Sequence, residues 1–440
     1  MLILAILALA TSEPWQRPGA PPPKNPPEAS PPKSPYVPGK RGARDADDDS
    51  GPAVLAEDAV AQEEGVAGKV PPLARRVEWA LPSLDADTIG RPRVELAGLA
   101  ADAQGFCVLQ GDDRDGSRNY VLLPLDVDLA PRGPALRIDD RASGRGQTDA
   151  AIAPAGSGKL ALAWLDVEDE SNRLRGRAWD AQGGSELWTM PLPIDRRTAE
   201  ERPTLPGRAL PRLEPALLAG EASWTVAVQV GGYVVLRELD PRTGAKLAEN
   251  VLGSRNQYAV SGPRLARDTT GATACAQETN RGVMLFLRLG AELTANCDLG
   301  PGTLFGLAGD PHSPEGGWWL LIRFQGRLLL RHLERSGAPD RPELELSTRP
   351  IANAQLAVGP RGACVLAQYA RGGLDALWID SASPEPSVNA TELRSADRPV
   401  IAASLAFRDE LCAFAWTERS GTRVELVACT ASASAHALGA

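Results

Sequence analysis

The segment Gly156–Lys159, which reads GSGK, is the first place where residue types suggest chemistry, because a glycine-rich turn that ends in lysine can bind phosphate. The full phosphate-binding pattern also needs an earlier glycine and a hydroxyl after the lysine, but Ala153 and Leu160 occupy those two positions. The residues after the turn alternate in size and show no helical period. The sequence therefore predicts a turn that leads into a strand.

Two acidic segments could bind a cation or a polar ligand. One contains Asp112 and Asp115, and the other begins at Asp166. The first lacks the twelve-residue ligand pattern of a calcium loop. Both follow equivalent strands, so we expect them on one face of the fold, either as solvated hairpin loops or as part of a binding site.

Other catalytic signatures are missing from the sequence. The three histidines are far apart, the six cysteines form no CxxC motif, and neither a serine–histidine–aspartate order nor an HExxH motif occurs. We therefore predict no catalytic residue, no metal and no cofactor. Two carboxylates placed for glycoside hydrolysis need no sequence motif and stay an open alternative.

Cys412 and Cys429 flank a turn near the C-terminus. If Arg419 faces Thr422, the two cysteines face each other across a hairpin, with Cβ atoms about 4.5–5.5 Å apart. A disulfide is one alternative, and two thiols are the other.

A strand of similar pattern recurs along the chain. Its last residue is a glutamine, a tryptophan or an arginine, and successive copies end 45 to 65 residues apart. The seven copies end at Gln110, Trp164, Gln229, Gln277, Arg323, Gln368 and Trp416. Amides, indoles and guanidinium groups at this position could line a channel and bind a sugar or peptide, or they could fill the gaps between repeats. We single out Asp112, Asp115, Trp164, Asp166, Arg323 and Trp416 as candidate binding residues.

Each copy lies within a unit of four short strands joined by tight turns. Aspartate begins several of these turns and glycine ends them, as in Asp240-Pro-Arg-Thr-Gly. One four-stranded sheet cannot bury both of its faces, whereas a ring of such sheets can. We predict an all-β fold, a β-propeller with seven four-stranded blades, with six or eight blades as alternatives. Residues 74–94 hold one more short strand, which could complete the last blade and close the ring.

Two units, YVVLRELDPRTGAKLAENV and AWDAQGGSELWTMPL, resemble the repeats of bacterial PQQ-repeat propellers such as the outer-membrane assembly lipoprotein. The resemblance implies a propeller fold. Quinone-dependent members of that class carry two adjacent cysteines, and this sequence has none. We therefore expect no quinone cofactor.

The N-terminal part differs from the rest in composition. Residues 1–10 are apolar and end in Ala-Leu-Ala, as in a signal peptide, and are too short to span a bilayer. Residues 11–69 form a proline-rich and then acidic segment, for which we predict a disordered linker. The propeller is expected over residues 70–440, in an exported, periplasmic or cell-surface protein.

The net charge of −9 argues against a general nucleic-acid binder. We predict a monomeric, non-enzymatic binding or scaffold protein without a transmembrane span, whose partner is a protein or polysaccharide of the cell envelope. The alternative is a carbohydrate-active hydrolase or lyase that uses carboxylates on one face of the ring.

Overall fold

The computed structural model describes part of the second of two units into which the chain divides, residues 1–66 and 67–440. The predicted signal segment and the whole of the predicted linker, together with Asp115 and Cys429, lie outside the described residues. The described ranges are 79–80, 94–112, 119–138, 147–156, 159–168, 171–179, 186–191, 215–230, 232–254, 257–380, 386–397, 399–418 and 421–428. They contain strands and turns and no helix.

The strands form seven antiparallel four-stranded sheets, each of which is one blade. In blades 1 to 6 the strands pair in chain order, from the innermost strand outward. Blade 1 contains β2 (Val94–Ala101), β3 (Gly105–Asp112), β4 (Asn119–Asp126) and β5 (Leu136–Arg137); blade 2, β6 (Gln147–Pro154), β7 (Leu160–Glu168), β8 (Ser171–Trp179) and β9 (Glu186–Pro191); blade 3, β10 (Ala216–Ala219), β11 (Trp224–Val230), β12 (Tyr233–Leu239) and β13 (Lys246–Leu252). Blade 4 contains β14 (Arg264–Arg267), β15 (Thr273–Thr279), β16 (Gly282–Leu289) and β17 (Glu292–Asp298); blade 5, β18 (Thr303–Gly309), β19 (Gly317–Phe324), β20 (Arg327–Glu334) and β21 (Leu344–Ser347); blade 6, β22 (Ile351–Gly359), β23 (Gly362–Tyr369), β24 (Leu374–Ile379) and β25 (Val388–Arg394). Blade 7 contains β26 (Ala402–Arg408), β27 (Leu411–Glu418), β28 (Gly421–Ala428) and β1 (Trp79–Ala80).

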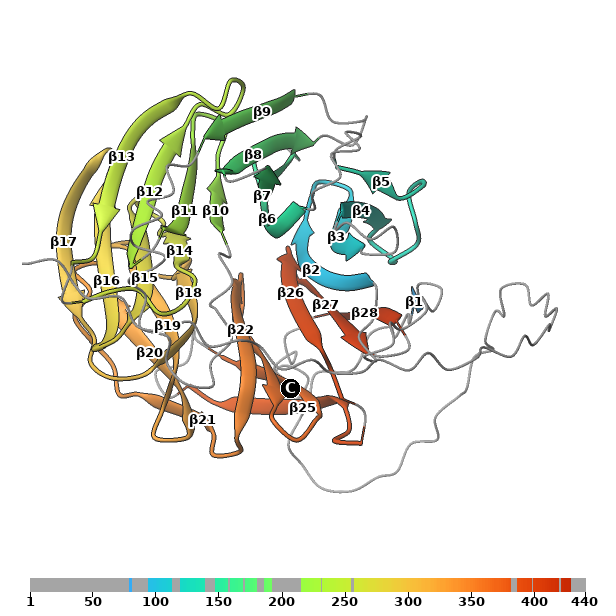
Figure 1. Ribbon diagram of the computed structural model, residues 1–440. Coiled ribbons are helices and arrows are strands. Elements are labelled where there is room, and N and C mark those ends of the chain that lie inside the picture. The colour runs from blue at the N-terminus through green and yellow to red at the C-terminus, as the bar shows by residue number, and fades with distance from the viewer. Residues whose placement is uncertain are drawn as a thin grey trace, which may run out of the picture. The chain divides into compact units, whose positions relative to one another are not determined.

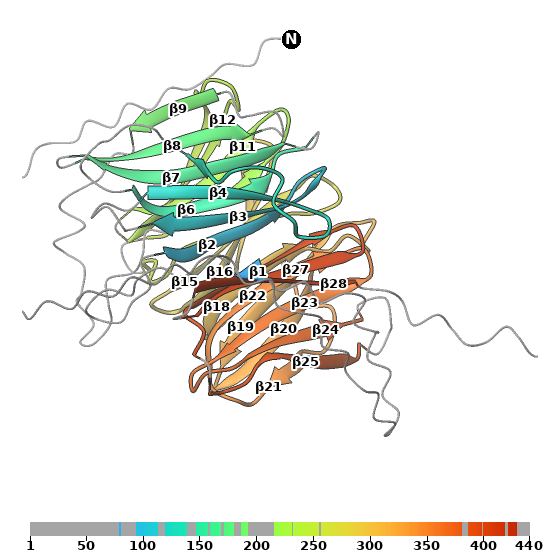
Figure 2. The same cartoon turned by 90° about the vertical axis from the view of Figure 1, so that its right-hand side faces the viewer.

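The blades form a closed ring. The first strand of each blade contacts the first strand of the next, and β2 contacts β26, so the series returns to its start. Both views of the ribbon place blade 1 beside blade 7 (Figures 1 and 2). The outer strand of blade 7 is β1, in which Trp79 pairs with Val424 of β28. The predicted seven-bladed propeller is confirmed, and so is its completion by a strand from residues 74–94.

Alternation along the second strand of a blade serves two interfaces at once. On β7, Leu162 and Trp164 join the hydrophobic cluster shared with blade 1. Ala161 and Ala163 point the other way and pack in the cluster that contains Trp224 of blade 3. All five side chains are at most 1% exposed. The alternation that predicted a strand therefore places large side chains against one neighbouring blade and small side chains against the other.

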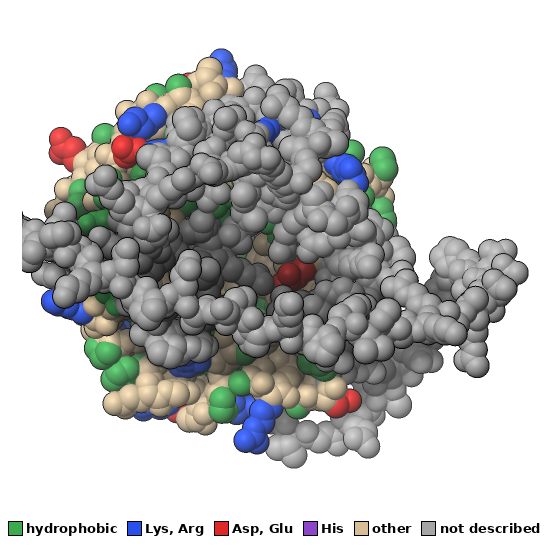
Figure 3. Space-filling model, in the orientation of Figure 1, with side chains coloured by type: hydrophobic (Ala, Val, Ile, Leu, Met, Phe, Trp, Pro, Cys, Tyr) green, Lys and Arg blue, Asp and Glu red, His purple; other side chains and the backbone are tan. Residues whose placement is uncertain are grey.

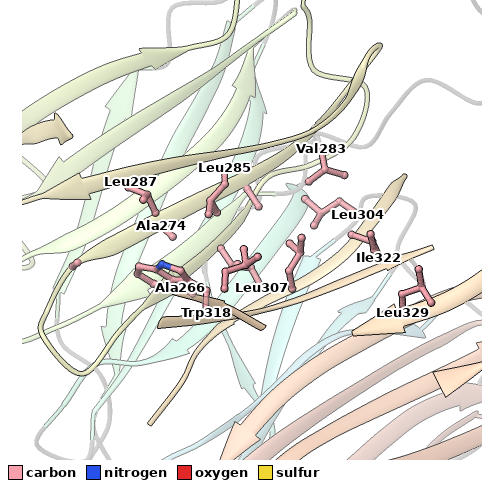
Figure 4. Packing of buried hydrophobic residues seen from close by; sticks show 14 residues of the cluster. Ala266, Ala274, Val283, Leu285, Leu287, Leu304, Leu307, Trp318, Ile322 and Leu329 are labelled. Carbon is pink, nitrogen blue, oxygen red and sulfur yellow. The ribbon is translucent and has the colours of Figure 1, made fainter. Parts of the chain in front are cut away.

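The cluster between blades 4 and 5 shows the same packing in close-up (Figure 4). Trp318 of β19 is fully buried and lies in this cluster with Leu285 of β16 and Leu307 of β18. Burial of side chains of this size contributes about 1.5–3 kcal/mol each. Contacts of this kind hold successive blades together.

The GSGK segment is a turn, as predicted. The backbone N–H of Lys159 donates to the carbonyl of Gly156 at 2.9 Å, and the N–H of Ala155 donates to the carbonyl of Lys159 at 2.8 Å. Gly156 has a φ of 78°, which glycine adopts at little cost. β7 begins directly after the turn at Leu160, so no helix end faces it.

The predicted aspartate turns are also present. One carboxylate oxygen of Asp240 accepts the backbone N–H groups of Arg242 at 2.9 Å and Thr243 at 2.8 Å. These hydrogen bonds lower the pKa of Asp240. Gly244 completes the turn with a φ of 68°. The turn chemistry of the repeat was therefore predicted correctly.

The register of the last hairpin differs from the one assumed for the cysteine pair. Glu418 pairs with Gly421, so Cys412 lies opposite Val427. The prediction that Cys412 faces Cys429 directly is wrong, because the turn begins one residue earlier than that register assumes: Glu418, and not Arg419, is the last paired residue before it. Cys429 itself is outside the described residues, so a disulfide between the two remains a prediction only.

Candidate functional site

The residues singled out from the repeat occupy equivalent places near the end of the second strand of each blade. We call this set the second-strand rim: Gln110, Trp164, Gln229, Gln277, Arg323, Gln368 and Trp416. All seven lie at the end of the blade where the chain passes from one blade to the next, since each innermost strand begins there. The rim is therefore the part of the ring that the sequence predicted to bind a ligand.

Three members of the rim tie one blade to the next. Gln229 donates its amide N–H to the carbonyl of Ala259 at 3.0 Å, and Arg323 donates Nη1–H to the carbonyl of Ile351 at 2.7 Å. Gln368 donates its amide N–H to the carbonyl of Val400. Each acceptor belongs to the chain that enters the following blade. Each of these three residues therefore bonds between blades, as the structural interpretation expects.

Trp164 and Trp416 are core residues. Both are fully buried, and they belong to the clusters between blades 1 and 2 and between blades 6 and 7. Trp416 donates Nε1–H to the carboxylate of Glu418 at 2.9 Å. Of the two alternatives given for these indoles, their burial fits a side chain that fills the gap between two blades and not one that lines a channel.

Gln277 is fully buried, and neither polar atom of its amide has a hydrogen-bond partner among the described residues. Gln229, in contrast, bonds to Ala259 in the connection that runs from residue 253 to 263, whereas only four residues separate β17 from β18 after blade 4. Gln277 thus has the residue type of the repeat but, among the described residues, forms no side-chain hydrogen bond to the next blade.

The acidic candidates fall into three cases. Asp112 ends β3 and is only 7% exposed, so it is a buried residue rather than part of a solvated loop. Asp166 lies on β7 opposite Arg173 of β8. Asp115 is outside the described residues. Asp112 and Asp166 do share one end of neighbouring blades, as predicted, since each is near the end of a second strand.

An arginine–aromatic–carboxylate arrangement that the sequence did not predict occurs at the same end of blade 6. The guanidinium of Arg349 lies 3.5 Å from the ring centre of Tyr369, and Nη1 is 3.1 Å from the carboxylate of Asp375. Tyr369 donates its hydroxyl to the same carboxylate at 2.7 Å. Burial, together with the hydrogen bond to Asp375, raises the pKa of Tyr369 to about 12.

Blade 7 repeats this arrangement with other residue types. Arg394 lies 4.7 Å from the ring centre of Trp416 and donates Nε–H to Glu418 at 2.8 Å. Arg349 and Arg394 both lie where the chain leaves an outer strand for the next blade. This shared position is the one feature of the sequence that could have indicated the arrangement, and it can be recognised only when the blade boundaries are known.

His332 is held between two carboxylates at the opposite end of blade 5. Its Nε2 is 2.9 Å from Asp310 and its Nδ1 is 2.6 Å from Asp340. Burial acts to lower the pKa of His332, but the two carboxylate hydrogen bonds outweigh it and raise the pKa above its usual value. Burial likewise acts to raise the pKa of Asp310, and the bond to His332 lowers it overall. The His332 ring thus joins two turns of one blade, which is a structural role.

The site as a whole contains hydrogen-bond donors, guanidinium groups and buried ion pairs. No group of three or more histidine, cysteine, aspartate or glutamate side chains in the described ranges could hold a metal ion. Nor does any helix in those ranges have the length and apolar character needed to cross a membrane. Of the basic and acidic side chains left uncovered in Figure 3, most are scattered around the edge of the view, and one acidic group lies near its centre.

No protein-family model matches the sequence, and no curated protein is significantly similar to it. Solved structures with a similar fold include the Dos1 propeller, with a TM-score of 0.48, 12% identity, and coverage of 80% of this chain and 94% of that one. Another is the subtype N10 neuraminidase-like protein of A/little yellow-shouldered bat/Guatemala/060/2010, with a TM-score of 0.42, 10% identity, and coverage of 81% and 98%. YCF48 from Cyanidioschyzon merolae has a TM-score of 0.44, 11% identity, and coverage of 80% and 99%. The assignment of a propeller made here depends on the strand pairing of this chain.

Proposed function

We propose that this protein is an exported, non-enzymatic β-propeller that binds or scaffolds a protein or polysaccharide of the cell envelope. The observation that carries the proposal is that side chains of the second-strand rim hold neighbouring blades together. Three side chains of the rim donate hydrogen bonds to the chain entering the next blade: Gln229, Arg323 and Gln368. Two others, Trp164 and Trp416, are buried between blades. Side chains committed in this way make a rigid ring, and a rigid ring suits a protein that presents loops to a partner.

The sequence pattern supports an envelope location. An apolar start followed by a proline-rich and acidic segment fits export and a spacer, and the repeats resemble those of PQQ-repeat propellers of the outer membrane. Cell fractionation of the source organism with an antibody to the propeller tests this part. Recovery in the envelope or the medium is expected, and recovery only with the cytoplasm would overturn the location.

Capture from the envelope fraction tests the binding function. The full chain is immobilised, exposed to solubilised envelope proteins and, separately, to envelope polysaccharides, and washed at 0.15 M salt. Specific retention of one protein or one polysaccharide is expected, with a heat-denatured sample as the control. Equal retention by native and denatured samples, or none by either, would overturn the proposal.

A carbohydrate-active enzyme is a second candidate, and one observation favours it. Asp375 and Glu418 are carboxylates at the same end of neighbouring blades, each in contact with an arginine. An enzyme of this kind would release sugar from a glycan panel, and Asp375→Asn or Glu418→Gln would abolish the release. Absence of turnover by the folded wild-type chain would remove this candidate and leave the binding protein.

A further inference from the structure

Two arginines meet at the strand pair that begins blade 6. Arg323 of blade 5 donates Nη1–H to the carbonyl of Ile351 at 2.7 Å. Ile351 pairs with Tyr369, and the guanidinium of Arg349 lies over the ring of Tyr369 at 3.5 Å. Two guanidinium groups from different elements are thus brought to one place at the end of the blade.

The positive charge at this place exceeds the negative charge that the described residues supply. Arg323 contacts neutral groups only, namely the carbonyl of Ile351, the hydroxyl of Thr303 at 3.4 Å and the ring of Phe305 at 5.7 Å. No carboxylate in the described part of the chain forms an ion pair with it. A half-buried charge without a counterion is stabilised by an anion that arrives from outside.

Arg349 is accessible to such an anion. It forms an ion pair with the carboxylate of Asp375, which also accepts the hydroxyl of Tyr369, and the side chain of Arg349 is 54% exposed. A guanidinium has five N–H donors in a planar fork. One contact through Nη1 and one stacked face therefore leave donors for a ligand carboxylate.

Asn353, a neutral donor, follows Ile351 by two residues on β22 and pairs with Gln368. Asn353 is exposed although it belongs to β22, the innermost strand of blade 6, so its accessible surface borders the centre of the ring. A register shift between Ile351 and Asn353 marks a bulge there. The amide oxygen of Asn353 accepts the N–H of Ala354 at 2.9 Å, which leaves its NH₂ group to point a donor at a ligand.

We propose that Arg323, Arg349 and Asn353 bind a carboxylate of an acidic polysaccharide at the inner end of blade 6. The inference rests on the proposed function, because it names the class of polysaccharide that the propeller takes. A uronate-type sugar presents one carboxylate with hydroxyl groups beside it. The carboxylate pairs with the guanidinium groups while a hydroxyl donates to Asp375, an acceptor in the same cluster. A run of glutamate residues offers carboxylates without hydroxyl groups beside them, so its side chains supply no donor to Asp375.

Titration calorimetry of the full chain with a trigalacturonate tests the site, with the carboxyl-reduced trimer and a hexaglutamate peptide as comparison probes. Wild type should bind the acidic trimer and neither of the other probes. Arg349→Gln should weaken binding at least about tenfold, the loss of about 1.4 kcal/mol expected for one charged contact. Arg323→Lys keeps the charge but loses the planar fork, and should weaken binding as well.

Arg361→Gln is the matched control. Arg361 is an exposed arginine of the same blade, paired with Glu410 at the opposite end of β22 and β23. This variant should bind the trimer as wild type does, and thermal melts should show that all variants are folded.

The outcomes separate the two proposals. Equal trimer binding by wild type, Arg349→Gln and Arg323→Lys would overturn the site. Preference for hexaglutamate would overturn the ligand class. If the full chain binds no acidic trimer yet captures a neutral glycan or a protein, the inference fails and the proposed function stands. If it captures nothing, both fail.

Discussion

Leu96 in blade 1 donates its backbone N–H to the hydroxyl of Thr417 in blade 7 at 2.9 Å, although 321 residues separate them in the sequence. Blades 4 and 5 have an equivalent contact, in which Leu304 donates its N–H to the carboxylate of Glu278 at 3.4 Å. Both donors directly precede a register shift in an innermost strand. A bulge removes a backbone group from the sheet ladder, and the neighbouring blade then supplies the acceptor.

Replacement of the Thr417 hydroxyl should weaken ring closure. Thr417→Val keeps the shape of the side chain but leaves the buried N–H of Leu96 without its acceptor, so the free energy of unfolding should fall by about 1–3 kcal/mol. Urea denaturation followed by tryptophan fluorescence measures the change. Thr417→Ser retains the hydroxyl and should lose less; an equal loss in the two variants would show that the hydroxyl has no role.

Removal of β1 should destabilise the propeller, whereas removal of the first unit should not. A chain that starts at residue 67 keeps Trp79 and Ala80 paired with β28. A chain that starts at residue 84 loses this strand and its few backbone hydrogen bonds, which contribute about 1–3 kcal/mol together. Melting temperatures compare the two chains directly. Identical values would mean that β1 does not contribute to the closed ring.

The two glutamines Gln368 and Gln277 should respond in opposite ways to the same change. Gln368→Met removes the amide that bonds to the carbonyl of Val400 and should cost about 1–3 kcal/mol. Gln277→Met replaces a buried amide that has no partner among the described residues, so stability should stay the same or rise. Denaturant midpoints decide this. A large loss in Gln277→Met would reveal a partner that the contacts described above do not include.

His332 should make the stability of the propeller depend on pH. Its pKa is raised in the fold above the ordinary 6.5, so its contribution is complete below pH 6.5 and is lost as the pH rises through the folded value. The pKa of Asp310 is lowered below the ordinary 3.8, so its contribution is present above pH 3.8 and is lost as the pH falls through the folded value. The pair should therefore stabilise the fold most between these two limits.

Comparison of wild type with His332→Gln at several pH values isolates this contribution. At pH 5.5 the variant should be less stable by about 1.5–3 kcal/mol, the size of a hydrogen bond to a charged group. At pH 9 the difference should be smaller. Arg341 and His312, the other charged or titratable groups near the cluster, are unchanged in both proteins. A difference that is constant from pH 5.5 to 9 would contradict the assignment of the charge to His332.

The architecture was predictable because it depends on local patterns. Alternation along Leu160–Trp164 identified a strand, and the aspartate and glycine of the turn at Asp240 identified its end. Repetition of that unit then implied the ring, and the extra short strand near Trp79 implied its closure. Each of these signals lies within a few tens of residues.

The roles of individual side chains were harder to predict because they depend on the neighbouring blade. Arg323 and Gln368 bond to carbonyl groups 28 and 32 residues away, in the chain that enters the next blade, and these acceptors become neighbours only when two blades pack together. Trp416 has the same place in the repeat and is fully buried. His332 left one signal, a polar residue on the apolar face of β20 with Leu328 and Leu330, but its partners Asp310 and Asp340 become neighbours only through two turns.

Blade 7 combines β1, the first described strand of the chain, with the last three strands, so it can form only at the end of synthesis. β1 leaves the ribosome first, yet the strand on which it docks ends at Ala428. Until that strand is synthesised, β1 has no partner and the first and last interfaces of the ring stay open. The last blade, and with it the closed ring, can therefore form only after the whole of β28 has been synthesised.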